Sequence, residues 1–355
     1  MAAQIPETAQ SYYFPTRGSY TNLALQTTPL PDLKSTDVLV KIHAVSLQYR
    51  DLMVASNRYP AGGLCDNLVP CSDMAGEVIA IGDDVMRWKV GDRVCANPAM
   101  DYRDGEVSED TMRAGLGGQQ HGVLTTYRAF PDHSLFRIPE HLSYEEASTL
   151  PCAALMTYNA LMGPKPVKAG DTVLILGTSG VSIFGLQFAV ASGATVIATS
   201  SSDAKLEIAK KLGATHTINY KTTPDWDKEV RMEGASIMFW KYAIPPLVGG
   251  PGTLKKSIVA TRFAGQVHMI GLVSQDVAEL TNIVGLCISK GIILRGVLIG
   301  STAQLESIVR LLRARPESTR PVVDKMFTFE EATDAYAYLE SQKHVGKVVI
   351  RVGSK

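Results

Sequence analysis

The sequence predicts an α/β protein of two domains, in which a β-rich domain comes first and a parallel, doubly wound sheet follows. Its 355 residues are enough for two hydrophobic cores of ordinary size. Short β-branched runs separated by turn residues fill roughly the first 150 residues. From about Gly170 onward, apolar strand-like runs alternate with helical segments, which is typical of a parallel sheet.

In the first part, alternating runs at Val38–Val45 and Ala75–Ile81 predict strands that are buried on one face. The polar, glycine-rich stretch 101–120 is interpreted as a long surface loop. Ser143 and Glu146 have the spacing of a capping box, so we expect a helix to begin there and to run toward Leu161.

In the second part, a continuous apolar run at Asp171–Leu176 indicates a strand that is buried on both faces. A glycine-bearing turn and a helix at Ile183–Ala191 follow it. The remaining expected elements are a strand at Thr195–Ala198, a helix at Ala204–Leu212 ending at Gly213, strands at Gly265–Ile270 and Gly291–Leu298, and a helix and strand over 328–352 that return to the first domain.

Composition excludes several classes of function. The formal net charge is zero, which argues against a nucleic-acid or membrane-surface binder. No apolar run is long enough to cross a membrane, and the first residues do not resemble a secretion signal, so a cytoplasmic protein is expected. The five cysteines are scattered without a Cys-x-x-Cys pair, which argues against a disulfide framework and a four-cysteine zinc lobe.

The turn after the first strand of the second part is a candidate dinucleotide site. Gly177 and Gly180 would let the backbone approach a pyrophosphate, and the N–H groups at the following helix start would face that anion. Thr178, Ser179 and Val181 complete this candidate segment. Because Ser179 and Ser182 replace glycines of a stricter pattern, a tight turn without a ligand remains an alternative.

The end of the next strand distinguishes the two nicotinamide cofactors. A site for NAD usually has an acidic residue there, which holds the ribose hydroxyls. Here Ser200, Ser201 and Lys205 offer hydroxyls and a cation, which suit the 2′-phosphate of NADPH. Asp203 is the one acidic residue nearby, and we expect it to cap the next helix.

The whole chain resembles the medium-chain dehydrogenase/reductase superfamily, and specifically its zinc-free quinone oxidoreductase-like branch. The matching stretches span both parts in the family order: Val38–Ala44, Tyr49–Asp51, Asp73–Glu77, Val90–Val94, Ala169–Asp171 and Lys211–Ala214. The resemblance implies a GroES-like catalytic domain over 1–155 and 301–355, a Rossmann domain that binds NADPH over 156–300, and an active site in the cleft between them.

The resemblance also implies that no zinc is bound. Zinc-containing members of the superfamily hold a catalytic metal with a Cys, a His and a further Cys or Asp. The matching positions of this chain are Gln48, Ser72 and Cys152, and one thiol cannot make a three-ligand site. His43 and His121 are interpreted as a strand and a loop histidine rather than as ligands.

Further site residues come from the same resemblance. Tyr59 matches a tyrosine that donates a proton or orients a carbonyl group, with interdomain packing as the alternative role. Tyr220 matches a tyrosine near the 2′-phosphate, and Ile270, Gly271 and Leu272 match the strand end that faces the nicotinamide. The expected activity is hydride transfer from NADPH to an enone, quinone or related carbonyl compound of small size, with pairing of two copies through Ile292–Leu298.

The pattern breaks between Arg231 and Val248, where the family has its central fourth strand. Residues 235–242 correspond to a one-base shift of the reading frame that would encode the family segment, so we hypothesise a frame-shifted or mis-spliced stretch. Ser236–Ile244 is still apolar enough for a substitute strand, but Lys241 and Pro245–Pro246 oppose one. A catalytically impaired family member and an alcohol dehydrogenase are therefore the alternatives to an active reductase.

Overall fold

The computed structural model describes residues 5–60, 62–241, 253–270 and 282–353. The chain divides into two compact units. The first comprises Met1–Leu155, Gly300–Pro316 and Arg320–Lys355, and the second comprises Met156–Ile299 and Glu317–Thr319. The first unit is therefore discontinuous in sequence, since the chain leaves it and returns.

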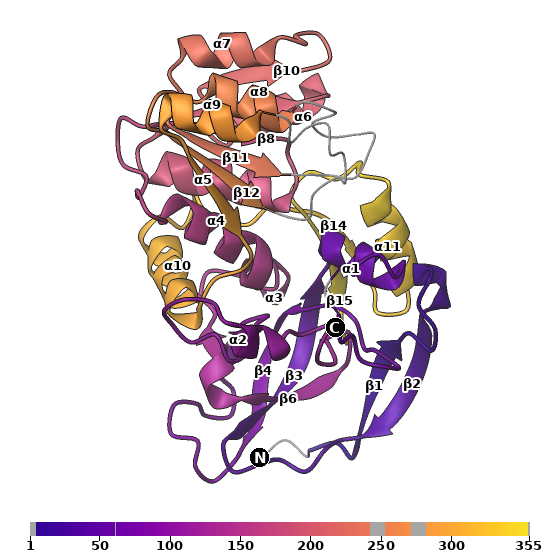
Figure 1. The fold of residues 1–355 in the computed structure, drawn as a ribbon. Helices are drawn as coiled ribbons and strands as arrows, with labels where there is room; N and C mark the ends of the chain where they lie inside the picture. The colour runs from indigo at the N-terminus through magenta and orange to yellow at the C-terminus, as the bar shows by residue number, and fades with distance from the viewer. Residues whose placement is uncertain (1–4, 61, 242–252, 271–281, 354–355) are drawn as a thin grey trace. The chain divides into compact units, whose positions relative to one another are not determined.

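The first unit is built on a seven-stranded sheet (Figure 1). Its strands run in the order β14-β15-β3-β4-β5-β7, and β6 pairs with β3. Strand β15 lies antiparallel to β3, so the expected return of the chain to its first part is confirmed. The strands are β1 (Thr8–Tyr13) and β2 (Ala24–Pro29), which form a separate hairpin, and β3 (Asp37–Ser46), β4 (Asp73–Ile81), β5 (Arg93–Ala96), β6 (Tyr127–Pro131), β7 (Leu135–Arg137), β14 (Val323–Phe327) and β15 (Lys347–Arg351).

The helices of the first unit are short. The expected capping box is present, because Ser143 Oγ accepts from the Glu146 N–H at 3.2 Å and Glu146 Oε2 accepts from the Ser143 N–H at 2.9 Å. The helix that it starts is divided into three pieces, with Pro151 in a π-helical turn in the middle. The helical elements are η1 (Tyr20–Asn22), α1 (Tyr49–Ala55), α2 (Glu109–Arg113), η2 (Asp132–Ser134), α3 (Tyr144–Ala147), η3 (Leu150–Ala154), α4 (Leu155–Leu161, which runs into the second unit), α10 (Thr302–Ala314) and α11 (Ala332–Glu340).

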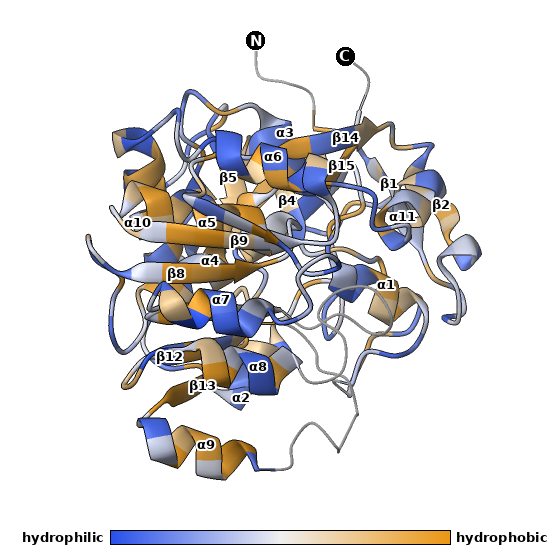
Figure 2. Ribbon diagram, turned by 90° about the horizontal axis from the view of Figure 1, so that it is seen from above, coloured by the Kyte–Doolittle hydropathy of each residue, from blue (hydrophilic) through white to orange (hydrophobic). Residues whose placement is uncertain are grey.

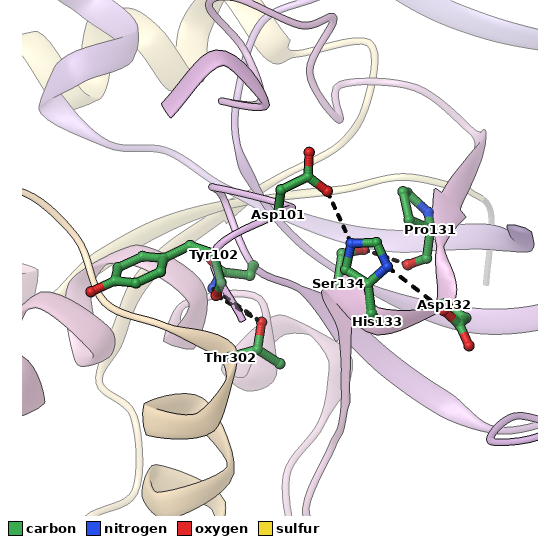
Figure 3. A network of polar contacts seen from close by, with 8 residues as sticks. Asp101, Tyr102, Pro131, Asp132, His133, Ser134 and Thr302 are labelled. Atoms are coloured by element: carbon green, nitrogen blue, oxygen red, sulfur yellow. Dashed lines mark hydrogen bonds and ion pairs between the residues drawn. The ribbon is translucent and has the colours of Figure 1, made fainter. Parts of the chain in front are cut away.

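The stretch 101–120 is not the simple surface loop that its composition suggested. It contains α2, and Leu116 is fully buried. Figure 3 shows how its start is held: the Tyr102 carbonyl oxygen accepts from Thr302 Oγ1 at 3.3 Å, and His133 Nε2 lies 2.9 Å from Asp101 Oδ1. Composition failed here because a few apolar residues in a polar stretch are enough to anchor it to a core.

The second unit contains one parallel sheet with the order β10-β9-β8-β11-β12-β13. Numbered by appearance in the unit, this order is 3-2-1-4-5-6, which is that of a Rossmann domain. Helices α5 and α6 cover one face and α7 and α8 cover the other (Figure 2). The elements are β8 (Thr172–Leu176), α5 (Gly180–Ala191), β9 (Thr195–Ser200), α6 (Asp203–Lys211), β10 (His216–Asn219), α7 (Trp226–Met232), β11 (Ile237–Lys241), α8 (Thr253–Ala260), β12 (Gln266–Ile270), α9 (Ile283–Lys290) and β13 (Ile293–Val297).

The segment that departs from the family pattern still supplies the fourth strand. Ile237 in β11 pairs with Val173 of β8 on one side and with Gln266 of β12 on the other. The expected substitute strand is thus confirmed, and its last residue is Lys241. Pro245 and Pro246 lie outside the described residues.

Each unit has its own core. In the first unit, apolar side chains of the large sheet pack against α11, where Tyr336 is fully buried. In the second, side chains of the parallel sheet such as Leu174 and Ile197 pack with Trp226 and Ile258 from the helices.

Candidate active site

The three positions that match family metal ligands converge on one carboxylate in the first unit. Asp73, at the start of β4, is fully buried. Its Oδ2 accepts from Gln48 Nε2 at 2.5 Å and from the Cys152 N–H at 3.2 Å, and its Oδ1 accepts from Ser72 Oγ at 2.8 Å. We call Gln48, Ser72, Asp73 and Cys152 the Asp73 cluster. Its polar groups are directed at one another.

Two further ionisable groups lie buried beside this cluster. Lys347, the first residue of β15, donates to the Leu47 carbonyl oxygen at 2.5 Å, and burial lowers its pKa. Burial raises the pKa of Asp73, and the Lys347 ammonium group opposes this rise. Burial also raises the pKa of Asp51 to about 6. Asp51 Oδ2 accepts from the Gln48 N–H at 2.7 Å, whereas Oδ1 has no hydrogen-bond partner among the described residues.

Cys152 remains a thiol in these surroundings. Burial raises its pKa far above the ordinary value, and the Asp73 carboxylate adds to this rise. Thiolate, not thiol, is the form that binds metals and attacks electrophiles. In the described parts of the chain, no three His, Cys, Asp or Glu side chains are grouped so that they could hold a metal ion.

His43 and His121 lie in a strand and in a loop, as the sequence predicts. His43 lies in β3 and stacks on Tyr144, with ring centroids 4.3 Å apart. His121 Nδ1 accepts from the Val69 N–H at 3.2 Å. Both rings are thus engaged in packing or backbone bonding.

The candidate tyrosine lies against an arginine. Tyr59 is half-buried, and the guanidinium carbon of Arg50 lies 5.0 Å from its ring centroid. Arg50 Nη1 donates to the Leu116 carbonyl oxygen at 2.9 Å. Burial lowers the pKa of Arg50, but Tyr59 and Asp51 outweigh this effect and leave that pKa raised. The guanidinium is therefore cationic at any working pH.

In the second unit, the glycine turn (Gly177–Gly180) joins β8 to α5 as the sequence predicted. Gly177 has a φ of +80°, which a side chain would strain, and its N–H donates to the Thr199 carbonyl oxygen at 2.9 Å. Ser182 Oγ donates back to the Leu176 carbonyl oxygen at 2.8 Å. Because the first N–H groups of a helix have no partner within it, the amides from Gly180 to Ser182 suit an anion. Thr178, Ser179 and Val181 lie in or directly after this turn.

The candidate residues for the 2′-phosphate lie at the ends of neighbouring strands. Ser200 ends β9, and its carbonyl oxygen accepts from the Tyr220 N–H at 3.1 Å, just after β10. Ser201 follows Ser200, and Lys205 lies in the first turn of α6. The structure therefore brings Ser200 and Tyr220 together. Ser201 and Lys205 follow Ser200 within five residues of the sequence.

The expectation that Asp203 caps α6 is wrong. Ser202 holds the cap position, and Asp203 is the first helical residue. The Asp203 carboxylate instead accepts from Asn219 Nδ2 at 2.8 Å. Sequence spacing alone does not separate two adjacent cap candidates. Ile270 is the last residue of β12 and is buried, while Gly271 and Leu272 lie outside the described residues.

Comparison with known proteins identifies the family. A family model for an alcohol dehydrogenase GroES-like domain matches residues 34–140, and one for a zinc-binding dehydrogenase matches residues 180–314. A zinc-type alcohol dehydrogenase-like protein of Schizosaccharomyces pombe is 43% identical over 324 residues, which are 90% of this chain and 92% of the relative. The chain belongs to the medium-chain dehydrogenase/reductase superfamily.

Two further proteins are similar to almost the whole chain. The 2-methylene-furan-3-one reductase of Solanum lycopersicum is 27% identical over 351 residues, or 98% of this chain and 80% of the relative. The crystal structure of a putative alcohol dehydrogenase from Sinorhizobium meliloti 1021 has a TM-score of 0.85 at 34% identity and covers 98% of this chain and 100% of its own. The predicted fold, a GroES-like domain with a Rossmann domain, is thus confirmed, and the chain is an oxidoreductase.

Three residues of the site were not predicted from the sequence: Arg50, Asp73 and Lys347. Arg50 and Asp73 lie in stretches that match the superfamily, but a stretch does not say which of its side chains meet. Lys347 is separated from Asp73 by most of the chain, so no local signal connects them. Among the described residues, no helix is both long and apolar enough to cross a membrane.

Proposed function

We propose that this protein is an NADPH-dependent, zinc-free reductase of an enone, a quinone or a related carbonyl compound. The observation that carries the proposal is the Asp73 cluster, in which the side chains of Gln48 and Ser72 and the backbone N–H of Cys152 all donate to one carboxylate. Reduction of an activated alkene needs no Lewis acid, whereas oxidation of an alcohol on this fold relies on one.

The donor chemistry of the cluster does not fit a catalytic zinc ion. Zinc favours thiolate, imidazole and carboxylate ligands. Gln48 and Ser72 offer an amide and a hydroxyl, and each donates one hydrogen bond to Asp73. The Cys152 thiol is held protonated by its surroundings, because burial raises its pKa. We derive no step through a metal.

The second unit fits a nicotinamide cofactor, of the kind that superfamily members bind. The amides of the glycine turn would hold the pyrophosphate, and Ser200, Ser201, Lys205 and Tyr220 would surround the 2′-phosphate of NADPH. Asp203, the acidic residue nearby, accepts a hydrogen bond from Asn219 at one carboxylate oxygen. Ile270, which ends β12, would face the nicotinamide, as the resemblance to the superfamily implies.

The bound cofactor supplies a hydride, and the protein must supply a proton. Tyr59 is our candidate for this acid, since a phenol can protonate the carbanion that hydride addition creates. Its position beside the Arg50 cation favours this role, because a cation stabilises the phenolate left behind. Buried Cys152 is a poorer acid in these surroundings.

An impaired member of the superfamily is the second candidate, because the segment 231–248 departs from the family pattern. The pairing of β11 with both β8 and β12 favours an intact sheet instead. A buried parallel strand needs an extended run of apolar residues, but it does not need particular ones. The sequencing of the transcript across this segment would separate a true variant from a mis-spliced message.

We also propose that two copies pair through β13. Among the described strands, β13 pairs only with β12, so one of its edges is open. Leu298, directly after it, is 54% exposed. An open, apolar strand edge favours pairing with an identical strand. Sedimentation velocity of the wild type and of a Leu294→Pro variant tests this pairing.

The test of the proposed function is anaerobic NADPH oxidation against a panel of enones and quinones. The wild type should consume NADPH with at least one of them, and metal analysis of the same sample should give no zinc. A variant with the family segment restored at 231–248 serves as the comparison. Activity confined to alcohols and NADP⁺, with one zinc per chain, would overturn the proposal.

A further inference from the structure

One half-buried cation of the first unit has no assigned task. Arg50 lies in α1 between Gln48 and Asp51, and so next to the Asp73 cluster. In the part of the chain that the structure describes, its guanidinium forms no ion pair within 4.0 Å. It donates to the Leu116 carbonyl oxygen, and it also forms a hydrogen bond with the Tyr59 side chain. Arginines removed from water without a carboxylate partner are costly, and they mark places where an anion binds.

The surroundings of Arg50 fix its position. Leu116 N–H donates to the Pro98 carbonyl oxygen at 2.8 Å, which anchors the acceptor that Arg50 uses. Gly118 has no side chain, and a Cβ built there would lie 2.5 Å from Arg50 Nη2. Gly117 has a φ of +64° and lies against the backbone of Cys71. A side chain at position 118 would therefore displace this end of the guanidinium.

Arg50 also links the two chemical groups that the site offers. Its guanidinium carbon lies 5.0 Å from the ring centroid of Tyr59, the candidate acid. Its charge also acts on the Cys152 thiol, at a position that matches a catalytic metal ligand of the superfamily. A fixed cation beside an acid is the arrangement that stabilises a developing oxyanion.

We propose that Arg50 binds the carbonyl oxygen of the substrate and stabilises the enolate formed from it, in place of a metal ion. The inference rests on the proposed function. Hydride adds to the β-carbon, the alkene π pair becomes the enolate, and negative charge gathers on oxygen beside Arg50. Tyr59 then protonates the α-carbon and is reprotonated by water. The alkene gains two electrons, which the cofactor loses as NADPH becomes NADP⁺.

The test compares three variants by steady-state kinetics with NADPH and the best enone of the panel. Arg50→Met should lower kcat by about a hundredfold or more with little change in KM, as the loss of an oxyanion donor does. Arg50→Lys should recover part of this loss. Gly118→Ala keeps the arginine but displaces Nη2, and it should lower kcat roughly tenfold. Arg113→Met, an exposed arginine of α2, is the control and should change neither constant.

A binding measurement keeps the inference testable without turnover. Pentane-2,4-dione forms a stable enolate whose ultraviolet absorbance reports its ionisation. The wild type should bind this enolate and shift its titration to lower pH, and Arg50→Met should bind at least tenfold more weakly. No binding by the wild type, or equal binding by Arg50→Met, overturns the role of Arg50. Binding through Arg50 without reduction of any enone or quinone would instead overturn the proposed function alone.

Discussion

The Asp73 cluster of the first unit and the glycine turn of the second both place polar groups beside buried strands. They differ in whether the hydrogen-bond donors already have an acceptor within the protein. In the cluster, an amide, a hydroxyl and a backbone N–H all point inward at Asp73. In the turn, Ser182 Oγ bonds back to Leu176, and the amides at the start of α5 have no acceptor in their own helix. The first arrangement is closed, and the second offers donors to a ligand.

This difference separates residues that hold the fold from residues that hold a substrate or cofactor. A closed cluster contributes to stability, so its loss should lower the free energy of unfolding more than it lowers the catalytic rate. A site whose donors have no acceptor in the protein contributes to ligand binding, and its loss should leave the fold almost unchanged. Arg50 and Tyr59 belong with the open kind, although they lie in the first unit beside the closed cluster.

The largest effect is expected from Asp73→Ala, which leaves three buried donors without their acceptor. We expect the free energy of unfolding of the first unit to fall by roughly 3–5 kcal/mol. Hydrogen exchange of the β4 amides during urea unfolding measures this unit separately from the second. Asp83→Ala, an exposed aspartate, is the control. A loss within about 1 kcal/mol of that control would mean that the hydrogen bonds to Asp73 do not stabilise the first unit.

Gly177→Ala should weaken NADPH binding by roughly 10–100-fold, because its φ of +80° strains any side chain and shifts the turn. Gly170→Ala is a matched control, since Gly170 has a φ of +87° and nothing within 4 Å of an added Cβ. Both variants carry the same backbone strain, so only Gly177→Ala should change the dissociation constant measured by NADPH fluorescence. Equal weakening by the two variants would remove the turn from the cofactor site.

Asp51 should make the first unit less stable at neutral pH. Its pKa is about 6 in the folded state, above the unfolded value near 3.8, so its ionisation costs stability above pH 6. That cost disappears as the pH falls from about 6 to about 4. Wild type should therefore gain about 1–2 kcal/mol from this group between pH 7 and pH 4.5, and Asp51→Asn should not.

The measurement is urea unfolding at both pH values, with Asp104→Asn, an exposed loop variant, as the control. Parallel pH dependence in wild type and Asp51→Asn would show that the carboxyl is not penalised by its burial. The Asp51 carboxylate would then be hydrated in the folded state.

The smallest effect is expected from Lys205→Ala in the first turn of α6. The loss of one cation near the 2′-phosphate should raise the Kd for NADPH about tenfold and leave that for NADH unchanged. Lys210→Ala, on the same helix and paired with Glu207, should change neither. If NADPH and NADH binding fall together, the assignment of cofactor type is wrong.

Much of the fold was predictable because its signals are local. The strand–turn–helix at Gly177 follows from an apolar run and two glycines, and the start of α3 follows from Ser143 and Glu146. Even β11 was predictable as a strand, since its apolar run outweighs its unfamiliar sequence. Parallel strands in the middle of a sheet need little more than this.

The parts that sequence reasoning missed depend on contacts between distant segments. Burial of Leu116 was hidden by the polar residues around it, and spacing along the chain did not show that Ser202, and not Asp203, holds the cap position of α6. The meeting of Asp73 with Gln48 and Cys152 joins three segments of the first unit, and spacing along the chain does not reveal it. The same is true of Arg50 and Leu116.

The position of β15 has a consequence for synthesis of the protein. This strand lies between β14 and β3, but the ribosome makes it only after every strand of the second unit. Until then, the edge of β3 that faces β15 is open, and Lys347 is not yet beside Asp73. The second unit can fold on the ribosome as soon as its own strands emerge, while the first must wait. Chaperones that shield strand edges should therefore engage nascent chains through β3.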